Sequence, residues 1–327
     1  MRWIICLASV AAAIISLNAS SSLANDSVAA MGAGGLVLSE SADIRMMSED
    51  LSISRNKVRV LYEFRNESSA AISTRVAFPL PKANMEELDD LSFGRLSENP
   101  ANPIDFRMKI DGQIVQPELE RKATYKGEDV TAFLVQHGVS LDYPGQDFRT
   151  KLQALPLGAK QALKERGLAD FANDNPWAVW TIQHTFHWMQ VFPAGRIVNV
   201  EHDYKPVVGG SYVITDGDHT VGRLKAEFQR FCLDERGARG ILRRVKMAKQ
   251  LSKGMGTSFI DYILTTGANW KGTIGTFKLT IDKDKPGNLA SLCMNGMRKT
   301  GPTTFVTSRR NFEPKRDLSI LIVSGPE

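Results

Sequence analysis

Two histidines three residues apart are the first candidates for chemistry. His184 and His187 form a His-x-x-His pair, which on a helix would bring both imidazoles to one side and allow them to bind zinc. The flanking residues alternate between apolar and polar types, which indicates a strand, where residues three apart face opposite sides. We therefore expect a hydrogen-bonded core histidine at position 184 and no metal site. For the same reason, we expect the side chains of neighbouring residues Glu201, His202 and Asp203 to point to alternating sides of a strand, so that they do not form a site together.

Acidic residues gather at two expected turns. Asp216-Gly217-Asp218 and Asp282-Lys283-Asp284 offer oxygen ligands of the kind that calcium prefers, but the remaining positions of a calcium loop do not follow. Turn chemistry explains both segments better.

Sequence motifs for catalysis and cofactor binding do not occur. The chain has no nucleophile elbow, no His-Glu-x-x-His, no phosphate-binding loop and no dinucleotide fingerprint. The sequence therefore predicts no cofactor and favours a role without catalysis. A site assembled from distant residues by folding stays open, because such sites are defined by geometry.

A cationic stripe is the strongest positional indication of binding. The segment from Asp234 to about Gly254 is predicted to be a helix with one apolar side. Positive side chains recur on its other side at steps of three or four: Arg236, Arg239, Arg243, Lys246, Lys249 and Lys253. Such a stripe is either an ordinary solvated face or a surface that binds lipopolysaccharide, an acidic glycan or an acidic protein.

Aromatic residues between positions 177 and 192 could stack on sugar rings if they were exposed. Trp180, Phe186 and Trp188 share one face of a predicted strand and are expected in the core. Trp177 and Trp270 lie in loop-like sequence and are the expected exposed aromatics.

The elements that position these residues are predicted to be mostly strands. Alternating residues at 58–64 and 72–80, joined by Asn66 to Ser69, predict an antiparallel hairpin, and Asp111-Gly112 predicts a tight turn. Val207 to Gly210 is expected to end a strand, and a helical insertion is expected near 152–168. The fold class is mainly β and sandwich-like, with two short helical insertions and two lobes, 25–210 and 211–327.

The N-terminus predicts export. Arg2, an apolar run from Trp3 to Leu17 and the triplet Ser22-Leu23-Ala24 are typical of a signal peptide cleaved after Ala24. The run is shorter than the roughly 20 residues that cross a bilayer, and no later span follows. We expect a periplasmic or secreted protein without a transmembrane span in the mature chain.

Cysteine usage fits that compartment. Cys232 and Cys293 are the two cysteines after the leader, and an oxidising compartment predicts that they pair; a reactive or metal-binding thiol is the alternative. The formal net charge of +5 is too small to imply nucleic acid as a partner.

Four segments carry a resemblance to a known family. The chain is similar to family 4424 of the domains of unknown function over 29–51 (AAMGAGGLVLSESADIRMMSEDL), 76–81 (VAFPLP), 188–211 (WMQVFPAGRIVNVEHDYKPVVGGS) and 262–279 (YILTTGANWKGTIGTFKL). The resemblance covers essentially the whole mature chain. It implies an exported bacterial protein with a β-rich fold, and it carries no catalytic residues over.

A second resemblance concerns the first half alone. Its strands, the FPLP segment, the Asp-Gly turn and residues 120–126 are similar in layout to the vault and inter-alpha-trypsin-type sandwich. The Asp-x-Ser-x-Ser metal motif of the domain that often follows that sandwich does not occur.

The sequence thus favours a non-catalytic envelope module that binds an anionic envelope component or another envelope protein. The alternative is a periplasmic hydrolase that acts on cell-wall or glycan material through residues brought together by folding. A purely structural subunit that assembles through its strand edges is a third possibility.

Overall fold

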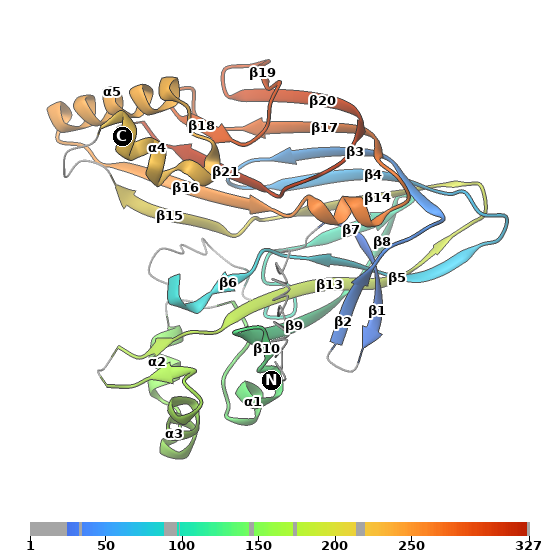
Figure 1. Ribbon diagram of the computed structural model, residues 1–327, viewed down its shortest axis with the longest axis horizontal. Coiled ribbons are helices and arrows are strands. Elements are labelled where there is room, and N and C mark those ends of the chain that lie inside the picture. Colours follow the sequence, from blue (N-terminus) through green and yellow to red (C-terminus); the bar gives the residue numbers. More distant parts are fainter. Residues whose placement is uncertain are drawn as a thin grey trace, which may run out of the picture.

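The structure is a computed structural model that describes residues 25–32, 35–87, 97, 99–143, 147–172, 175–213 and 220–325. The predicted leader, residues 1–24, and the acidic turn at 216–218 lie outside the described residues. The protein is mainly β, and its two larger sheets form two layers with the core between them (Figure 1). The predicted fold class, mainly β and sandwich-like, is confirmed.

The upper layer is an eight-stranded sheet. Its order is β19-β20-β17-β3-β4-β14-β7-β8, and all neighbours are antiparallel except β17 and β3. The strands are β3 (Ile44–Ile53), β4 (Val58–Asn66), β7 (Arg107–Ile110), β8 (Gln113–Val115), β14 (Ile197–Tyr204), β17 (Ile274–Asp282), β19 (Arg298–Lys299) and β20 (Thr304–Phe312). The burial of β4 alternates strictly, so Val58, Val60, Tyr62 and Phe64 face the core as the sequence predicts.

The lower layer is built around one long strand. β13 pairs with β9 and with both β5 and β6, and β5 continues to β1 and β2. The strands are β1 (Ser27–Gly32), β2 (Gly35–Ser39), β5 (Ile72–Pro79), β6 (Ala83–Asn84), β9 (Glu118–Tyr125), β10 (Glu128–Asp129) and β13 (Thr181–Phe192). Phe186 of this sheet stacks on Phe106, with ring centroids 4.3 Å apart, and thereby joins the two layers.

The predicted hairpin of 58–64 and 72–80 is wrong. β4 pairs with β3 and β14 in one layer, whereas β5 pairs with β13 and β1 in the other. Asn66 stabilises the connection from β4 in one layer to β5 in the other, because its side-chain amide donates to the carbonyls of Ala70 and Phe192. Alternation shows that each segment has one buried face, but it does not identify the strand that pairs with it.

A four-stranded sheet extends the upper layer at one end. Its order is β15 (Val208–Val213), β16 (Met255–Tyr262), β21 (Leu318–Val323) and β18 (Leu289–Leu292). The segment 207–210, expected to end a strand, instead begins β15. A separate hydrophobic cluster packs this sheet against α4 (Val221–Glu227), η2 (Gln229–Phe231) and α5 (Glu235–Leu251).

The remaining helices are short. They are η1 (Met85–Glu87), α1 (Thr131–Gln136), α2 (Phe148–Gln153), α3 (Leu157–Glu165) and η3 (Thr265–Asn269), and β11 (Ala169–Asp170) pairs with β12 (Trp177–Ala178). The expected insertion near 152–168 is thus two helices, because Pro156 is the N-cap of α3. Gly167, with φ +66°, follows the last turn of α3 and lies within the predicted insertion.

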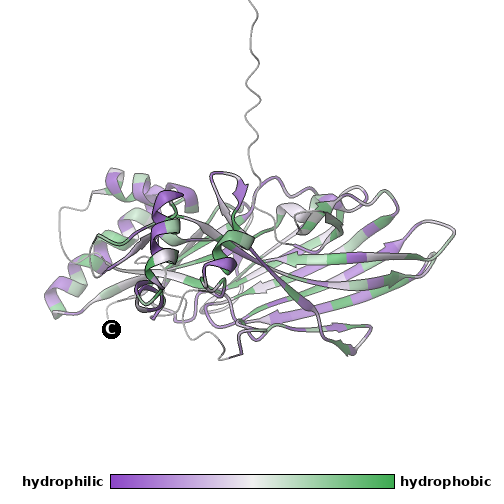
Figure 2. Cartoon of the chain, turned by 90° about the horizontal axis from the view of Figure 1, so that it is seen from below, coloured by the Kyte–Doolittle hydropathy of each residue, from purple (hydrophilic) through white to green (hydrophobic). Residues whose placement is uncertain are grey.

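Figure 2 shows hydrophilic and hydrophobic residues alternating along the strands and separated onto different sides of the helices. Within the described part of the chain, none of the helices has the length and apolar character needed to cross a membrane. The lobe boundary at residue 210 stays a prediction, and strands from both sides of it share the eight-stranded sheet.

Candidate functional site

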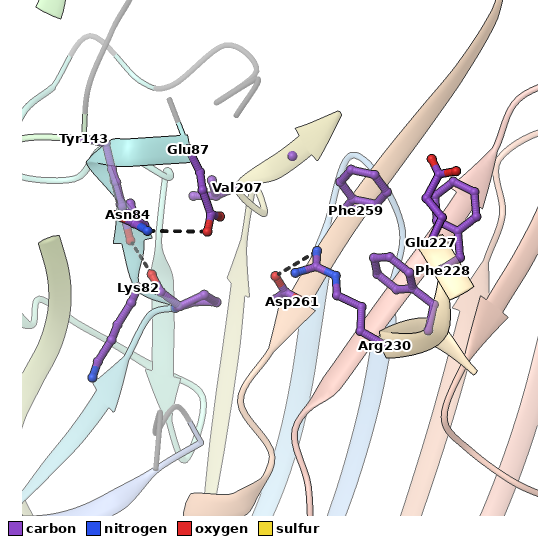
Figure 3. A pocket seen from close by; sticks show the side chains of 14 residues that line it. Lys82, Asn84, Glu87, Tyr143, Val207, Glu227, Phe228, Arg230, Phe259 and Asp261 are labelled. Carbon is purple, nitrogen blue, oxygen red and sulfur yellow. Dashed lines mark hydrogen bonds and ion pairs between the residues drawn. The ribbon is translucent and has the colours of Figure 1, made fainter. Parts of the chain in front are cut away.

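A pocket of about 420 Å³ lies where the lower layer meets the four-stranded sheet. One wall comes from residues 81–87 and Tyr143, and the other from β15, β16 and the α4–η2 segment (Figure 3). Burial raises the pKa of the Tyr143 hydroxyl above its usual range. Tyr143 therefore contributes an uncharged hydroxyl to the lining of the pocket.

The wall from the four-stranded sheet combines a cation with aromatic rings. The Arg230 guanidinium lies over Phe231 and Phe259, 4.5 and 5.4 Å from the ring centroids, and the two rings stack on each other. Arg230 also lies 3.8 Å from Asp261, whose other carboxylate oxygen accepts a hydrogen bond from Ser319. These contacts orient a guanidinium that is still 54% exposed, so it is available to a ligand.

The opposite wall is polar. Asn84 donates to Glu87 over 3.4 Å, and Lys82 lies beside them (Figure 3). Together with Glu227, the lining contains three carboxylates and two cations. This mixture does not favour a simple anion, and it suits a small ligand that has an apolar part and charges of both signs.

The second candidate site is the exposed face of α5. Asp234 caps the helix by accepting from the amide of Gly237, as the sequence predicts. The six predicted cations are all exposed: Arg236, Arg239, Arg243, Lys246, Lys249 and Lys253. Arg239 pairs with Glu235, and the described residues provide no ion pair for the other five.

α5 has a large excess of positive charge. α5 contains six cations and one carboxylate, a net charge of +5, which equals the net charge of the entire chain. Met247 and Leu251 on the same helix are about half exposed, at 50% and 55%. We call the exposed side chains of α5 and Lys253 the basic face.

The two aromatic residues that are predicted to be exposed differ in burial. Trp177 is 44% exposed, as expected, but the expectation for Trp270 is wrong, because this side chain is only 3% exposed. Its indole donates to the carbonyl of Asp26 and its ring packs 4.5 Å from Phe64. The glycines around Trp270 made the segment look like a loop, yet η3 folds it onto the core.

The histidines have structural roles. His184 is fully buried, and its Nε2 bonds to the carbonyl oxygen of Leu141, as expected of a core histidine. Glu201 and Asp203 point outward to ion pairs while His202 points inward, so these neighbours diverge as predicted. Among the described residues, no three His, Cys, Asp or Glu side chains are grouped to hold a metal ion.

Sequence reasoning missed a buried polar cluster at the start of the described chain. It consists of Asn25, Asp26, Glu49, Tyr62, His202 and Tyr262, all buried. Glu49 faces the core because β3 has a bulge between Met46 and Ser48, which moves the later residues to the opposite face. The sequence contains a signal of this bulge, since the apolar residues Met46 and Leu51 lie five positions apart, an odd step that would place them on opposite faces of a regular strand.

The fold and these surfaces define a mainly β, sandwich-like protein that presents a basic helix and an aromatic-lined pocket. A family model, Domain of unknown function (DUF4424), matches residues 24–321, and the chain belongs to this family. The search of curated proteins returns no match. A solved structure of a candidate nutrient binding protein from Legionella pneumophila is similar with 16% identity and a TM-score of 0.45, covering 91% of this chain and 72% of that one.

Proposed function

We propose that this protein is an exported, non-catalytic binding module that engages an anionic component of the cell envelope through the basic face. The observation that carries the proposal is the concentration of charge on α5, whose net +5 equals that of the whole chain. A solvated face of a stable helix has no need of such an excess, because mixed charges serve solubility as well.

The composition of the basic face indicates the chemistry of the ligand. Guanidinium groups bind phosphate and carboxylate groups with two parallel hydrogen bonds. Met247 and Leu251 add exposed apolar surface beside these charges. A basic helix with exposed apolar side chains is typical of binding to an anionic lipid surface, and we propose lipid headgroup phosphates as the target.

The basic face is held rigidly enough to bind without reorganisation. Buried residues Ala238, Ile241, Val245 and Ala248 attach α5 to the four-stranded sheet. Arg244 secures the helix from the side, because its guanidinium donates to the carbonyl of Gly287 over 2.8 Å. The remaining cations are therefore presented from a fixed backbone, which reduces the entropy lost on binding.

The test compares two triple variants of the protein. Arg239→Gln, Arg243→Gln and Lys246→Gln together neutralise the basic face, and Arg298→Gln, Lys299→Gln and Arg310→Gln neutralise three exposed cations at β19 and β20 as the matched control. Binding is measured to vesicles that contain anionic phospholipid or lipopolysaccharide, and to neutral vesicles, at low and high salt.

The expected loss is large and specific to the helix. Each cation near an anionic membrane contributes about 1 kcal/mol, so the helix variant should bind roughly 100-fold more weakly, and the control variant much less so. Equal losses in both variants, or no binding by the unaltered protein, would refute the proposal. Binding to an acidic protein but to no vesicle would assign the face to a protein partner.

The pocket supports a second candidate, a periplasmic hydrolase of cell-wall or glycan material. Glu87, Glu227 and Asp261 line one pocket, and paired carboxylates are the groups that cleave glycosidic bonds. Release of soluble fragments from peptidoglycan, abolished in Glu87→Gln or Glu227→Gln, would establish this function. The layout similarity of the first half to the vault and inter-alpha-trypsin-type sandwich remains a prediction and carries no part of either proposal.

A further inference from the structure

The first described residues are built into the core of the protein. Asn25, Asp26 and Ser27 have no exposed surface. Thr266 donates its hydroxyl proton to the carbonyl of Asn25 over 2.7 Å, and the Trp270 indole donates to the carbonyl of Asp26 over 2.6 Å. The backbone of Asn25 and Asp26, directly after the predicted cleavage site, is therefore held in the core.

The fit around Asn25 is tight. Its side-chain nitrogen donates to Glu49 over 3.2 Å, and its side-chain oxygen accepts from the Tyr62 hydroxyl. A Cβ added at Gly267 would lie 2.8 Å from that nitrogen, so a larger residue there would displace the Asn25 side chain. Asn25 thus occupies a site shaped for it by β3, β4 and η3.

This site contains two buried acids without a cationic partner. Asp26 and Glu49 are buried, and no lysine or arginine of the described residues pairs with either. Neither carboxyl oxygen of Asp26 makes a hydrogen bond, and His202, 3.5 Å away, makes none through either nitrogen. Unpaired buried polar groups are costly, so this arrangement requires an explanation.

The surroundings of the acids contain no lysine or arginine among the described residues. The groups that face them are Glu49 of β3, Tyr62 of β4, His202 of β14, Tyr262 of β16, Thr266 of η3 and Trp270. Burial raises the pKa of Glu49 to about 8 and the pKa of Asp26 well above its ordinary value, with Glu49 raising the latter further. In an uncleaved chain burial therefore favours the neutral form of both acids.

We infer that hydrolysis of the peptide bond between Ala24 and Asn25 creates the cation of this cluster, the α-ammonium group of Asn25. An endopeptidase adds one water across the bond, which leaves a carboxylate on Ala24 and an ammonium group on Asn25. The new charge is carried by Asn25, whose side chain contacts Glu49 and which directly precedes Asp26 in the chain. The mature N-terminus becomes a charged part of the core.

We rest this inference on the export proposed above, and it is independent of anion binding. Cleavage converts a neutral cluster into one in which ammonium and carboxylate stabilise each other, because a nearby opposite charge favours the ionised acid. The precursor should accordingly be less stable than the mature protein above pH 7. Removal of the leader would then complete folding as well as release the chain.

The first experiment examines the exported protein itself. The full gene is expressed, the protein is purified from the envelope fraction, and its N-terminal residue is determined. The α-amine is then acetylated under native conditions and in denaturant. We expect Asn25 as the first residue and native acetylation at least tenfold slower than in the unfolded chain. A different first residue, or equal rates, would overturn the inference while leaving export intact, and a chain found only uncleaved in the cytoplasm would overturn both.

A second experiment separates charge from shape. A glycine inserted between Ala24 and Asn25 moves the ammonium group out of the cluster, and a leucine inserted after Leu17 is the control that leaves the mature chain unchanged. At pH 8.5 the glycine variant should have a melting temperature at least about 5 °C below that of the control variant, and at pH 6 the difference in melting temperature should be smaller. Glu49→Gln should lower the melting temperature of the normal protein and raise that of the glycine variant. The same sign in both backgrounds would overturn the charge pairing.

Discussion

The disulfide between Cys232 and Cys293 allows a quantitative test of how the C-terminal part is held. The bond is present as predicted and closes 61 residues of chain, which include α5, β16, β17 and β18. In the chain-entropy model, closing a loop of this length stabilises the folded protein by about 4 kcal/mol. We expect the double variant Cys232→Ala, Cys293→Ala to lose roughly this free energy of unfolding.

The backbone at Cys232 modifies this value. Cys232 has φ +51°, in the left-handed region, where a side chain costs about 1 to 2 kcal/mol relative to glycine. Alanine keeps this strain after the bond is lost, whereas glycine relieves it. The variant Cys232→Gly, Cys293→Ala should therefore be about 1 kcal/mol more stable than the double alanine variant.

Equilibrium unfolding in urea, followed by circular dichroism, measures the free energy of unfolding. It is applied to the natural protein, to the two double variants and to the natural protein with its disulfide reduced. The reduced protein and the double alanine variant should agree. A loss below about 1 kcal/mol in both would refute the reasoning, because it would mean that the hydrophobic cluster under α5 already restricts the unfolded chain or that the loop is ordered without the bond.

Two further predictions concern the core. The variant Gly275→Ala should lose about 2 kcal/mol or more of its free energy of unfolding, because a Cβ there would lie 2.5 Å from the carbonyl oxygen of Met47. The control variant Gly158→Ala on α3 meets no atom within 4 Å and should be slightly more stable than the natural protein. Equal melting temperatures of the two variants would contradict the close approach at Gly275. Burial lowers the pKa of His202 to about 3 and that of His184 to about 4, so the unfolded chain binds protons below pH 6.5 that the folded chain does not. The free energy of unfolding should therefore fall by about 1.4 kcal/mol per pH unit for each histidine as the pH drops from 6.5 toward 4. In urea titrations at several pH values, His202→Phe should remove about half of this pH dependence. An unchanged pH dependence would show that His202 does not contribute.

Local sequence signals predicted elements wherever a single residue sets the geometry. Asp234 begins α5, and Asp111 and Gly112 form their tight turn with φ values of +47° and +80°. Trp188 and its apolar neighbours on β13 lie in the core, as alternation indicates. In each case the pattern that determines the feature lies within a few residues along the chain, and the sequence therefore contains it.

Features that depend on distant contacts could not be predicted. The partner of β5 is β13, more than a hundred residues later, and nothing in either pattern specifies this pairing. Trp270 is buried because its indole reaches the carbonyl of Asp26, a contact between opposite ends of the chain. The basic face was predictable from spacing, whereas the pocket was not, because Glu87 of η1 and Asp261 of β16 are far apart in the sequence.

The pocket and the basic face are coupled through one segment of chain. η2 contributes Arg230 and Phe231 to the pocket wall, and Cys232 follows directly and joins this segment to the loop after β18. Two residues later Asp234 begins α5, so the position of the helix and the orientation of Arg230 are fixed from the same point. The carbonyl of Arg230 lies 3.3 Å from the Cys293 sulfur, so the disulfide also contacts the segment that bears Arg230. A ligand that enters the pocket and displaces η2 would consequently move the N-terminus of α5, and binding at one surface should alter affinity at the other.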